Sequence, residues 1–283
     1  MSYNLVFNST NVSGNQNSTF NYNFLGSTLP LDEGTEICIS SATIPYSWFN
    51  ITTIYNNTSF QVVFTIGVTL TTYTITLPQG FYSISDINNF LQNYCITNGL
   101  YLIDGNGNNI YYLQIVLNTT YYSTQILSFP VPISLPSGYT QPSNWVGYPT
   151  VTATPYIILG TDNFRLLLGF MAGNYPPSVQ TTSYSVLSNV LPPLGSNVNA
   201  LIFTCNLVNN SCVSPTNILD SFPINTTFGS NLTYVPSFEK WVKVTSGRFN
   251  RITLTMLDQN LNTIYANDPN ISITLLIRPA QKK

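Results

Sequence analysis

The acidic residues are the only side chains in this sequence whose number and chemistry could support catalysis. The chain has no histidine, which removes the commonest general base and the serine–histidine and cysteine–histidine nucleophile pairs. A glycoside-hydrolysing site would need two carboxylates that face each other. The candidates are the ten acidic residues Asp32, Glu33, Glu36, Asp86, Asp104, Asp162, Asp220, Glu239, Asp258 and Asp268.

Most of these acids stand at positions typical of turns or helix starts. Asp104 precedes a glycine, Asp258 begins an Asp-Gln-Asn sequence, and Asp268 precedes a proline. Asp86 falls in the first turn of a predicted helix. Hydrogen bonds to the local backbone account for acids in such places, so we predict that the chain is not an enzyme and has no catalytic residues.

Metal and cofactor patterns are also missing. The sequence has no CxxC pair among its cysteines, Cys38, Cys95, Cys205 and Cys212, and no histidine to complete a zinc set. We expect mostly buried thiols in a reducing compartment, and the pairing of Cys205 with Cys212 stays open. Asp104, Asn106 and Asn108 resemble the start of a calcium loop, but its terminal acid and flanking helices are lacking. Because no phosphate-binding or dinucleotide motif occurs, we predict no metal and no cofactor.

The chain is unusually poor in charge. Charged residues make up 6% of its 283 residues and the net charge is −2, whereas about 25% is typical of soluble proteins. The densest basic group, Lys240, Lys243, Arg248 and Arg251, is too sparse for a nucleic-acid groove, so we predict no direct contact with nucleic acid. A surface of amides and hydroxyls suits a protein that packs against neighbours, because desolvating these groups costs less than desolvating charges.

The aromatic residues also indicate a protein that packs against neighbours. The chain has 19 tyrosines and 16 phenylalanines, and outward-facing tyrosines are typical anchors of protein interfaces. We expect Phe24, Phe64, Phe203 and Phe249 to face the core. The doublets Tyr111-Tyr112 and Tyr121-Tyr122 should each place one ring on either face of a strand.

One segment has helical periodicity. Apolar residues recur at helical spacing within 83–99, either Ser83 or Ser85 can cap its start, and Gly99 stands where a helix would end. We predict a β-hairpin formed by residues 59–66 and 72–77. A second hairpin joins 100–103 to 110–117 through a loop that contains Asp104-Gly105 and Asn106-Gly107, residues that favour a tight turn.

The patterns in the rest of the chain predict short strands. Period-two patterns occur at 19–25, 35–44, 156–159, 199–208, 231–235, 240–245, 249–257 and 271–278. Six prolines interrupt residues 128–155 and prevent a regular strand ladder there. These patterns predict an all-β sandwich with one short helix and a loop-rich insertion. We expect a flexible arm over 1–18, in which Leu5, Val6 and Phe7 clamp a neighbour, and one domain over 19–283 with a protruding insertion at about 128–155.

The start of the chain has no basic and apolar stretches of a signal peptide, and no run of about 18 apolar residues occurs. We therefore expect cytoplasmic synthesis and no membrane span.

Five ordered segments resemble the penton, or minor capsid, proteins of virophages and related polinton-like DNA viruses. They are residues 37–51, 73–94, 166–176, 200–210 and 249–278. The helix entry Pro-Gln-Gly-Phe-Tyr-Ser-Ile-Ser-Asp-Ile-Asn, the Leu-Leu-Gly-Phe segment ending in Tyr-Pro, and the closing hairpin with Asp-Gln-Asn are the most specific parts.

The resemblance implies an all-β single jelly-roll subunit that forms a homopentamer and closes the five-fold vertices of an icosahedral virion. Its neighbours would be a double-jelly-roll major capsid protein and other minor capsid proteins, with assembly in the cytoplasm of the infected cell. Three alternatives stay open. They are a cement or other minor capsid protein, a receptor- or carbohydrate-binding spike module with Trp48, Trp145 or Trp241 over a groove, and a jelly-roll glycosidase.

Overall fold

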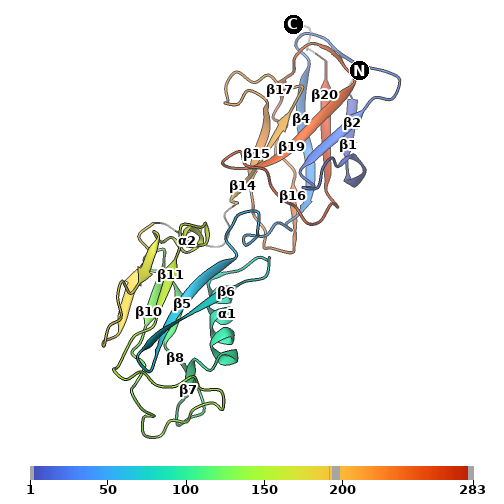
Figure 1. Cartoon of the computed structure of the whole chain (residues 1–283). Coiled ribbons are helices and arrows are strands. Elements are labelled where there is room, and N and C mark those ends of the chain that lie inside the picture. The colour runs from blue at the N-terminus through green and yellow to red at the C-terminus, as the bar shows by residue number, and fades with distance from the viewer. Residues whose placement is uncertain (1–2, 191, 193–197, 280–283) are drawn as a thin grey trace. The chain divides into compact units, whose positions relative to one another are not determined.

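The computed structural model describes residues 3–190, 192 and 198–279. The chain divides into two compact units (Figure 1). Unit 1 comprises residues 1–48 and 198–283, and unit 2 comprises residues 49–197. Unit 2 is therefore a single long insertion into the sequence of unit 1.

Eight main strands build unit 1. In chain order they are β1 (Tyr3–Phe7), β2 (Thr19–Asn23), β4 (Glu36–Pro45), β14 (Ala200–Cys205), β15 (Ile218–Pro223), β16 (Asn231–Tyr234), β19 (Arg251–Asp258) and β20 (Ser272–Arg278). One sheet has the order β1-β20-β4-β16 and the other has the order β15-β14-β19-β2. Every neighbouring pair is antiparallel.

The strand order of unit 1 is that of a jelly roll. Counted along the chain, the first strand pairs with the eighth, the second with the seventh, the third with the sixth and the fourth with the fifth. This is the pairing of one long antiparallel hairpin that has been rolled into a two-sheet sandwich. The fold prediction of an all-β jelly roll is confirmed, and unit 2 enters between the third and fourth of these strands.

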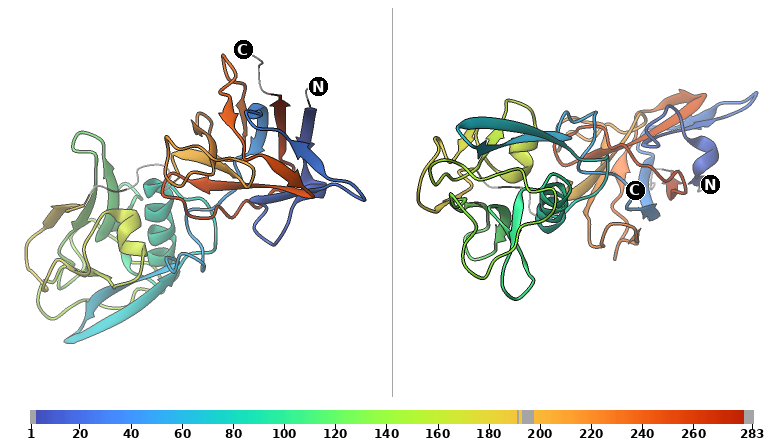
Figure 2. Two further views of the ribbon diagram at one scale, coloured as in Figure 1. Left: turned by 90° about the horizontal axis from the view of Figure 1, so that it is seen from above. Right: turned by 60° about the horizontal axis from the view of Figure 1, so that its bottom comes forward.

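Smaller elements complete unit 1. Strand β17 (Val242–Lys243) adds to β4, and β3 (Leu29–Leu31) pairs with β18 (Gly247–Phe249). A single 3-10 turn, η1 (Ser9–Asn11), follows β1. Because Tyr3 on β1 is opposite Ile277 on β20, the first and last strands of the chain lie side by side in this unit (Figures 1 and 2).

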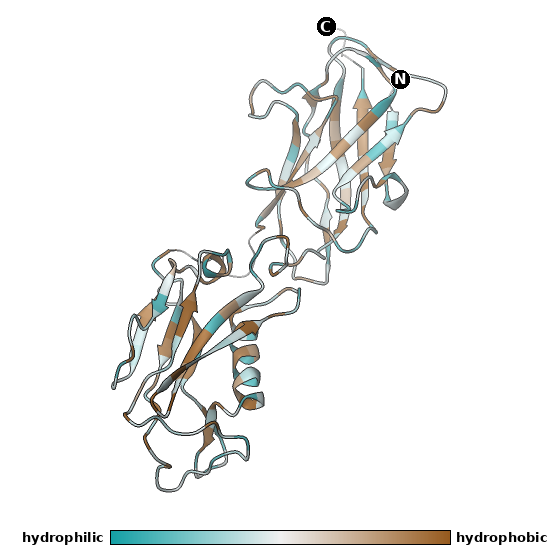
Figure 3. Cartoon of the chain, viewed as in Figure 1, coloured by the Kyte–Doolittle hydropathy of each residue, from teal (hydrophilic) through white to brown (hydrophobic). Residues whose placement is uncertain are grey.

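The core of unit 1 follows from period-two alternation along its strands. In β19 the residues Ile252, Leu254 and Met256 are buried and alternate with partly exposed threonines. The same alternation of apolar and polar positions runs along most strands of both units (Figure 3). A strand with one apolar face must bury that face against a second layer, which is what the sandwich provides.

Unit 2 contains a four-stranded sheet, a three-stranded sheet, a two-stranded hairpin and the helices. The four-stranded sheet has the order β12-β11-β5-β6, from β5 (Ser59–Ile66), β6 (Thr69–Thr76), β11 (Tyr156–Leu159) and β12 (Gly173–Tyr175). The three-stranded sheet has the order β13-β10-β9, from β9 (Leu113–Asn118), β10 (Ser123–Ser128) and β13 (Tyr184–Leu187). The hairpin is β7 (Tyr101–Ile103) and β8 (Asn109–Tyr111), and a one-turn helix, α2 (Phe164–Leu168), follows β11.

The predicted helix is α1 (Ile84–Thr97). Ser83 is its N-cap, and Ser83 and Asp86 bond each other's backbone N–H in a capping box. Ile87, Leu91 and Cys95 are buried in the core of unit 2. On the side facing β9, the Asn88 carboxamide oxygen accepts a hydrogen bond from the Ile115 N–H at 2.9 Å. The helix ends at Asn98, followed by Gly99 with φ +64°.

The arrangement of domains differs from the prediction. Residues 3–7 of the expected arm form β1, with Leu5 and Phe7 buried, because their alternate apolar side chains complete a sheet of the sandwich. Residues 1 and 2 lie outside the described residues. The jelly roll is built by unit 1 alone, and the Pro-rich stretch 128–155 is one part of the larger insertion 49–197.

The Pro-rich stretch is fastened to its own unit rather than standing apart from it. Asn144 donates side-chain hydrogen bonds to the carbonyls of Ile96 and Thr97 at 3.1 Å, and Val146 N–H donates to Gly99. The free carbonyls at a helix end need such partners. The stretch therefore closes the C-terminal end of α1.

Candidate functional site

Asp104 and Asp258 lie in turns, as the sequence analysis predicted. Asp104 accepts from the N–H groups of Asn106 and Asn108, and these bonds hold the pKa of its carboxyl below the usual range. Asp258 accepts from Asn260 and Asn262 in the same way. Each of these carboxylates therefore stabilises the turn in which it lies.

Among the remaining acids, Glu36 and Asp220 are engaged in ion pairs, and Asp86 and Asp162 accept hydrogen bonds from nearby backbone N–H groups. Glu36 on β4 pairs with Arg278 on β20, and the Nε–Oε2 distance is 2.8 Å. Asp162 Oδ1 accepts from Phe164 N–H at 3.1 Å. Within the part of the chain that the structure describes, no group of three or more His, Cys, Asp or Glu residues is arranged to hold a metal ion.

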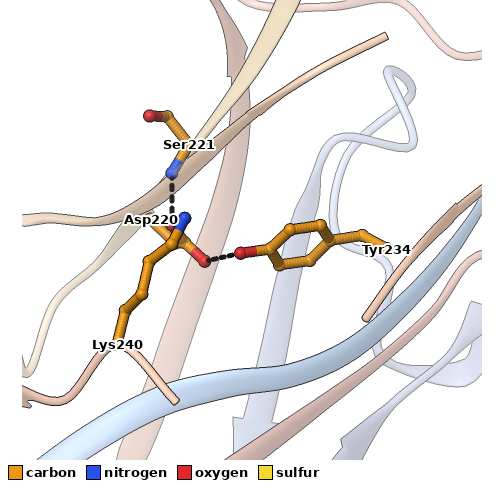
Figure 4. Close-up of polar contacts among 4 residues, drawn as sticks. All are labelled: Asp220, Ser221, Tyr234 and Lys240. Atoms are coloured by element: carbon orange, nitrogen blue, oxygen red, sulfur yellow. Dashed lines mark hydrogen bonds and ion pairs between the residues drawn. The ribbon is translucent and has the colours of Figure 1, made fainter. Parts of the chain in front are cut away.

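A polar cluster with a buried carboxylate surrounds Asp220 on β15 (Figure 4). Its side chain is only 5% exposed. Oδ2 accepts from the Tyr234 hydroxyl at 2.8 Å, and Oδ1 lies 2.9 Å from Lys240 Nζ and accepts from Ser221 N–H at 2.8 Å. Burial lowers the pKa of Lys240, but its bonds with Tyr234 and Asp220 outweigh this and raise it. Both carboxylate oxygens are occupied, so this cluster ties β15 to β16 and to the chain at Lys240.

The cysteines are four free thiols. Cys38, Cys95 and Cys205 are buried and Cys212 is exposed, which bears out the expectation of mostly buried thiols. Burial raises the pKa of Cys38 to about 11, of Cys95 to about 12 and of Cys205 to about 11. A thiol is nucleophilic as its thiolate, so the three buried cysteines are unreactive near neutral pH.

The tryptophans do not form a binding platform. Trp48 is buried, with an exposed fraction of 1%. Trp241 is covered by the Arg278 guanidinium, 4.0 Å above its ring. Trp145 is partly buried and contacts Tyr148 at a ring distance of 5.1 Å.

The aromatic predictions are confirmed in part. Phe64 and Phe203 are buried in the core, whereas Phe24 and Phe249 are only partly buried. Tyr121 and Tyr122 are both exposed because they lie in the turn between β9 and β10. The prediction that this doublet places one ring on each face of a strand is therefore wrong, because the turn exposes both rings.

Charge is distributed very unevenly between the units. Unit 2 has 149 residues, 49–197, and only four charged side chains, which are Asp86, Asp104, Asp162 and Arg165. The other acids, lysines and arginines all belong to unit 1. The surface of unit 2 is therefore suited to neutral hydrogen-bonding partners.

Unit 2 carries a pocket of about 410 Å³, which we call the β5 pocket. Its floor is the side of the β12-β11-β5-β6 sheet that faces away from the core, where Gln61 on β5 stands between Thr74 on β6 and Ile158 on β11. Phe60 and Val62, which alternate with Gln61, point into the core. The remaining lining comes from Ser59, Phe60 and the loop residues Asn56, Gly160, Thr161 and Asp162.

The two loops that wall the β5 pocket are bonded to each other. Asn163 N–H donates to the Asn56 carbonyl at 3.1 Å, and the Asn163 carboxamide donates to the Tyr55 carbonyl at 2.7 Å. Phe60 behind the floor stacks on Phe164 with ring centroids 4.7 Å apart. Sequence reasoning missed this pocket because its residues are separated by up to a hundred positions and carry no motif.

Among the described residues, none of the helices has the length and apolar character needed to cross a membrane.

A scan against protein-family models finds no match, and a search of curated proteins finds none either. Among solved structures, the chain is similar to the crystal structure of the mavirus penton protein, with 13% identity and a TM-score of 0.42 over 98% of each chain. It is also similar to a chain in the 3.5 Å cryo-EM structure of the Sputnik virophage, with 12% identity and a TM-score of 0.40, covering 99% of this chain and 97% of that one. Both similarities extend over nearly the full length of the chain.

Proposed function

We propose that this chain is a structural protein of an icosahedral viral capsid, in which five copies form the vertex. The observation that carries the proposal is the complete eight-strand jelly-roll pairing of unit 1, one of the architectures used for capsid shells. Jelly rolls also occur in lectins and cupins, so the fold alone does not decide the function.

The chemistry of the chain favours the shell role over an enzymatic one. Seven of the ten acids are engaged in turns, a helix cap or ion pairs, and the chain has no histidine. A shell protein needs extended contacts instead, and interface cores are depleted in charged residues and enriched in aromatic ones. The low charge and high tyrosine content of this chain match that composition.

The proposed partners are further copies of the chain, a double-jelly-roll major capsid protein and other minor capsid proteins. The proposed location is the virion, at the capsid vertex. A cement protein that does not form rings is the closest alternative. The arrangement of Trp48 and Trp241 gives no support to a spike module that binds a ligand across exposed tryptophans.

Native mass spectrometry of the purified full chain tests the proposal. A closed five-subunit ring of 31.4 kDa chains has a mass near 157 kDa. A ring of this mass supports the vertex role, whereas a trimer would contradict it and indicate a shell-face or spike role. A monomer at high concentration would favour the cement alternative.

Salt provides an independent check on the same ring. Contacts between neutral surfaces are screened little by salt. We therefore expect the ring to persist between about 0.1 M and about 1 M salt, where the Debye length falls from about 10 Å to about 3 Å. A ring that dissociates in high salt would show that ion pairs hold it together.

A further inference from the structure

We propose that the β5 pocket of unit 2 binds a neutral saccharide, one or two sugar rings in size. Its volume of about 410 Å³ falls within the range of about 300–1,000 Å³ usual for small-ligand sites. The proposal concerns a binding site on the inserted unit, and it does not depend on how many copies of the chain assemble.

The lining of the pocket determines the ligand class. It offers the hydroxyls of Ser59, Thr74 and Thr161, the carboxamides of Asn56 and Gln61, and the carboxylate of Asp162. Hydroxyls and carboxamides can each donate and accept hydrogen bonds, which matches the paired character of sugar hydroxyls. No lysine or arginine lines the pocket, so phosphate, sulfate or carboxylate ligands would meet no countercharge.

Several of these polar groups are free to bond a ligand. Among the described residues, the side chains of Asn56, Ser59 and Thr161 make no hydrogen bond to the protein. Asp162 uses Oδ1 to accept from Phe164 N–H and retains Oδ2. The pocket therefore presents donors and acceptors that are not bonded to the protein at four positions around one space.

The framework of the pocket is held in place before any ligand arrives. Its floor is three hydrogen-bonded strands, in which Gln61 is directly opposite Thr74 and Ile158. Its walls are the two loops joined through Asn163. Preorganised groups lose little freedom on binding, which favours recognition by hydrogen bonds alone.

The expected affinity is low. Phe60 is buried against Phe164 and offers no exposed face for a sugar ring to stack on. Individual hydrogen bonds exchanged with water contribute little net free energy. We therefore expect dissociation constants of roughly 1 mM for a single ring.

Saturation-transfer NMR on the full chain tests the proposal with a defined panel of sugars. The panel is glucose, galactose, mannose, N-acetylglucosamine, lactose, maltose and chitobiose, with methylammonium as a cationic probe. Ser59→Tyr fills the pocket with a ring that strands accommodate readily. Asn93→Ala, an exposed change on α1, is the matched control.

At least one sugar should bind, and Ser59→Tyr should weaken it at least about tenfold, the loss expected when several hydrogen bonds are blocked. Asn93→Ala should leave binding unchanged, and both variants should unfold at the wild-type denaturant midpoint. Thr161→Val, which keeps the side-chain shape, should weaken binding severalfold.

Three results would overturn the proposal. The first is that no sugar binds at about 20 mM, a concentration well above the expected dissociation constant. The second is that wild type and Ser59→Tyr bind the sugar equally well. The third is that methylammonium is the only probe that binds and that Asp162→Asn abolishes its binding. Native mass spectra of the same variants separate this outcome from the proposed assembly, because a lost pocket with an intact ring affects only the saccharide proposal.

Discussion

Tyr234 on β16 stacks face to face on Phe222 of β15, with ring centroids 3.9 Å apart and planes inclined by 9°. The two strands are the edges of different sheets, so the stack joins the two layers of the sandwich. The Tyr234 hydroxyl continues to Asp220 on the same partner strand. On the opposite side, Phe7 of β1 contacts Tyr22 of β2 edge to face at 6.1 Å. Aromatic contacts thus join the sheets along both margins of the jelly roll.

The stack and the hydroxyl bond of Tyr234 can be separated by mutation. Tyr234→Phe keeps the ring and should lower the free energy of unfolding by about 1.5 kcal/mol, the lower end of the range for a hydrogen bond to a charged group. Tyr234→Ala also loses the ring and should cost about 3 kcal/mol. Denaturant unfolding measures both. The exposed Tyr121→Ala should change stability by less than about 0.5 kcal/mol, and equal effects of the two Tyr234 variants would show that the stack contributes nothing.

The N-terminal strand gives a second prediction, which replaces the expected assembly clamp. Phe7 is fully buried and Val6 is 47% exposed. Phe7→Ser should lower the free energy of unfolding by about 3–5 kcal/mol, as for other buried aromatic truncations, while Val6→Ser should cost less than about 0.5 kcal/mol. If Phe7→Ser unfolds at the wild-type midpoint, β1 does not pair with β20 in solution.

Substitutions of two glycines, Gly99 and Gly107, test the contact at the C-terminal end of α1, with Gly107 as the control. Gly99 and Gly107 both have positive φ, +64° and +84°. A Cβ on Gly99 would lie 1.9 Å from the Asn144 carbonyl oxygen, whereas one on Gly107 would meet nothing within 4 Å. Gly107→Ala should cost about 1–2 kcal/mol from backbone strain alone.

Gly99→Ala should cost clearly more, because the Pro-rich stretch at Asn144 must move away from the helix end. Thermal unfolding of the two variants provides the comparison. Equal midpoints would mean that residues 128–155 do not rest against α1 in solution.

The burial of the thiols leads to two predictions, one for cysteine labelling and one for the pH dependence of stability. At pH 8 a thiol reagent should modify one cysteine per native chain, Cys212, and all four cysteines after denaturation. The raised pKa values of Cys38, Cys95 and Cys205 mean that the native state holds protons which the unfolded state releases above pH 9. Their contribution to stability is therefore complete below about pH 9 and is lost as the pH rises through 11 to 12.

Replacing Cys95 by Ala separates this effect from the ionisation of tyrosines. The variant should be less stable at pH 7, because a buried side chain is truncated, and its stability should fall less steeply than that of wild type above pH 9. Parallel curves for the two proteins would contradict a role of the Cys95 thiol in the alkaline loss.

Local features were predictable because their causes are local. The capping box at Ser83 and Asp86, the turn held by Asp104, and the β5–β6 hairpin each form within about twenty residues. Strand β15 was not predicted because its sequence, Ile-Leu-Asp-Ser-Phe-Pro, contains a buried carboxylate and breaks the alternation. Tyr234 and Lys240 stabilise that carboxylate, and neither partner can be identified from the strand itself.

The sequence by itself determined the type of each long element, the absence of histidine chemistry and the scarcity of charge. These depend on composition and on patterns of period 2 or 3.6, which the chain carries at every point. Tertiary structure alone decided that β1 pairs with β20 across the whole chain, that residues 49–197 form a unit inserted into a jelly roll, and that Asn56, Gln61 and Asp162 line one pocket. The physical reason is that alternation specifies which face of a strand is buried but not which strand lies beside it.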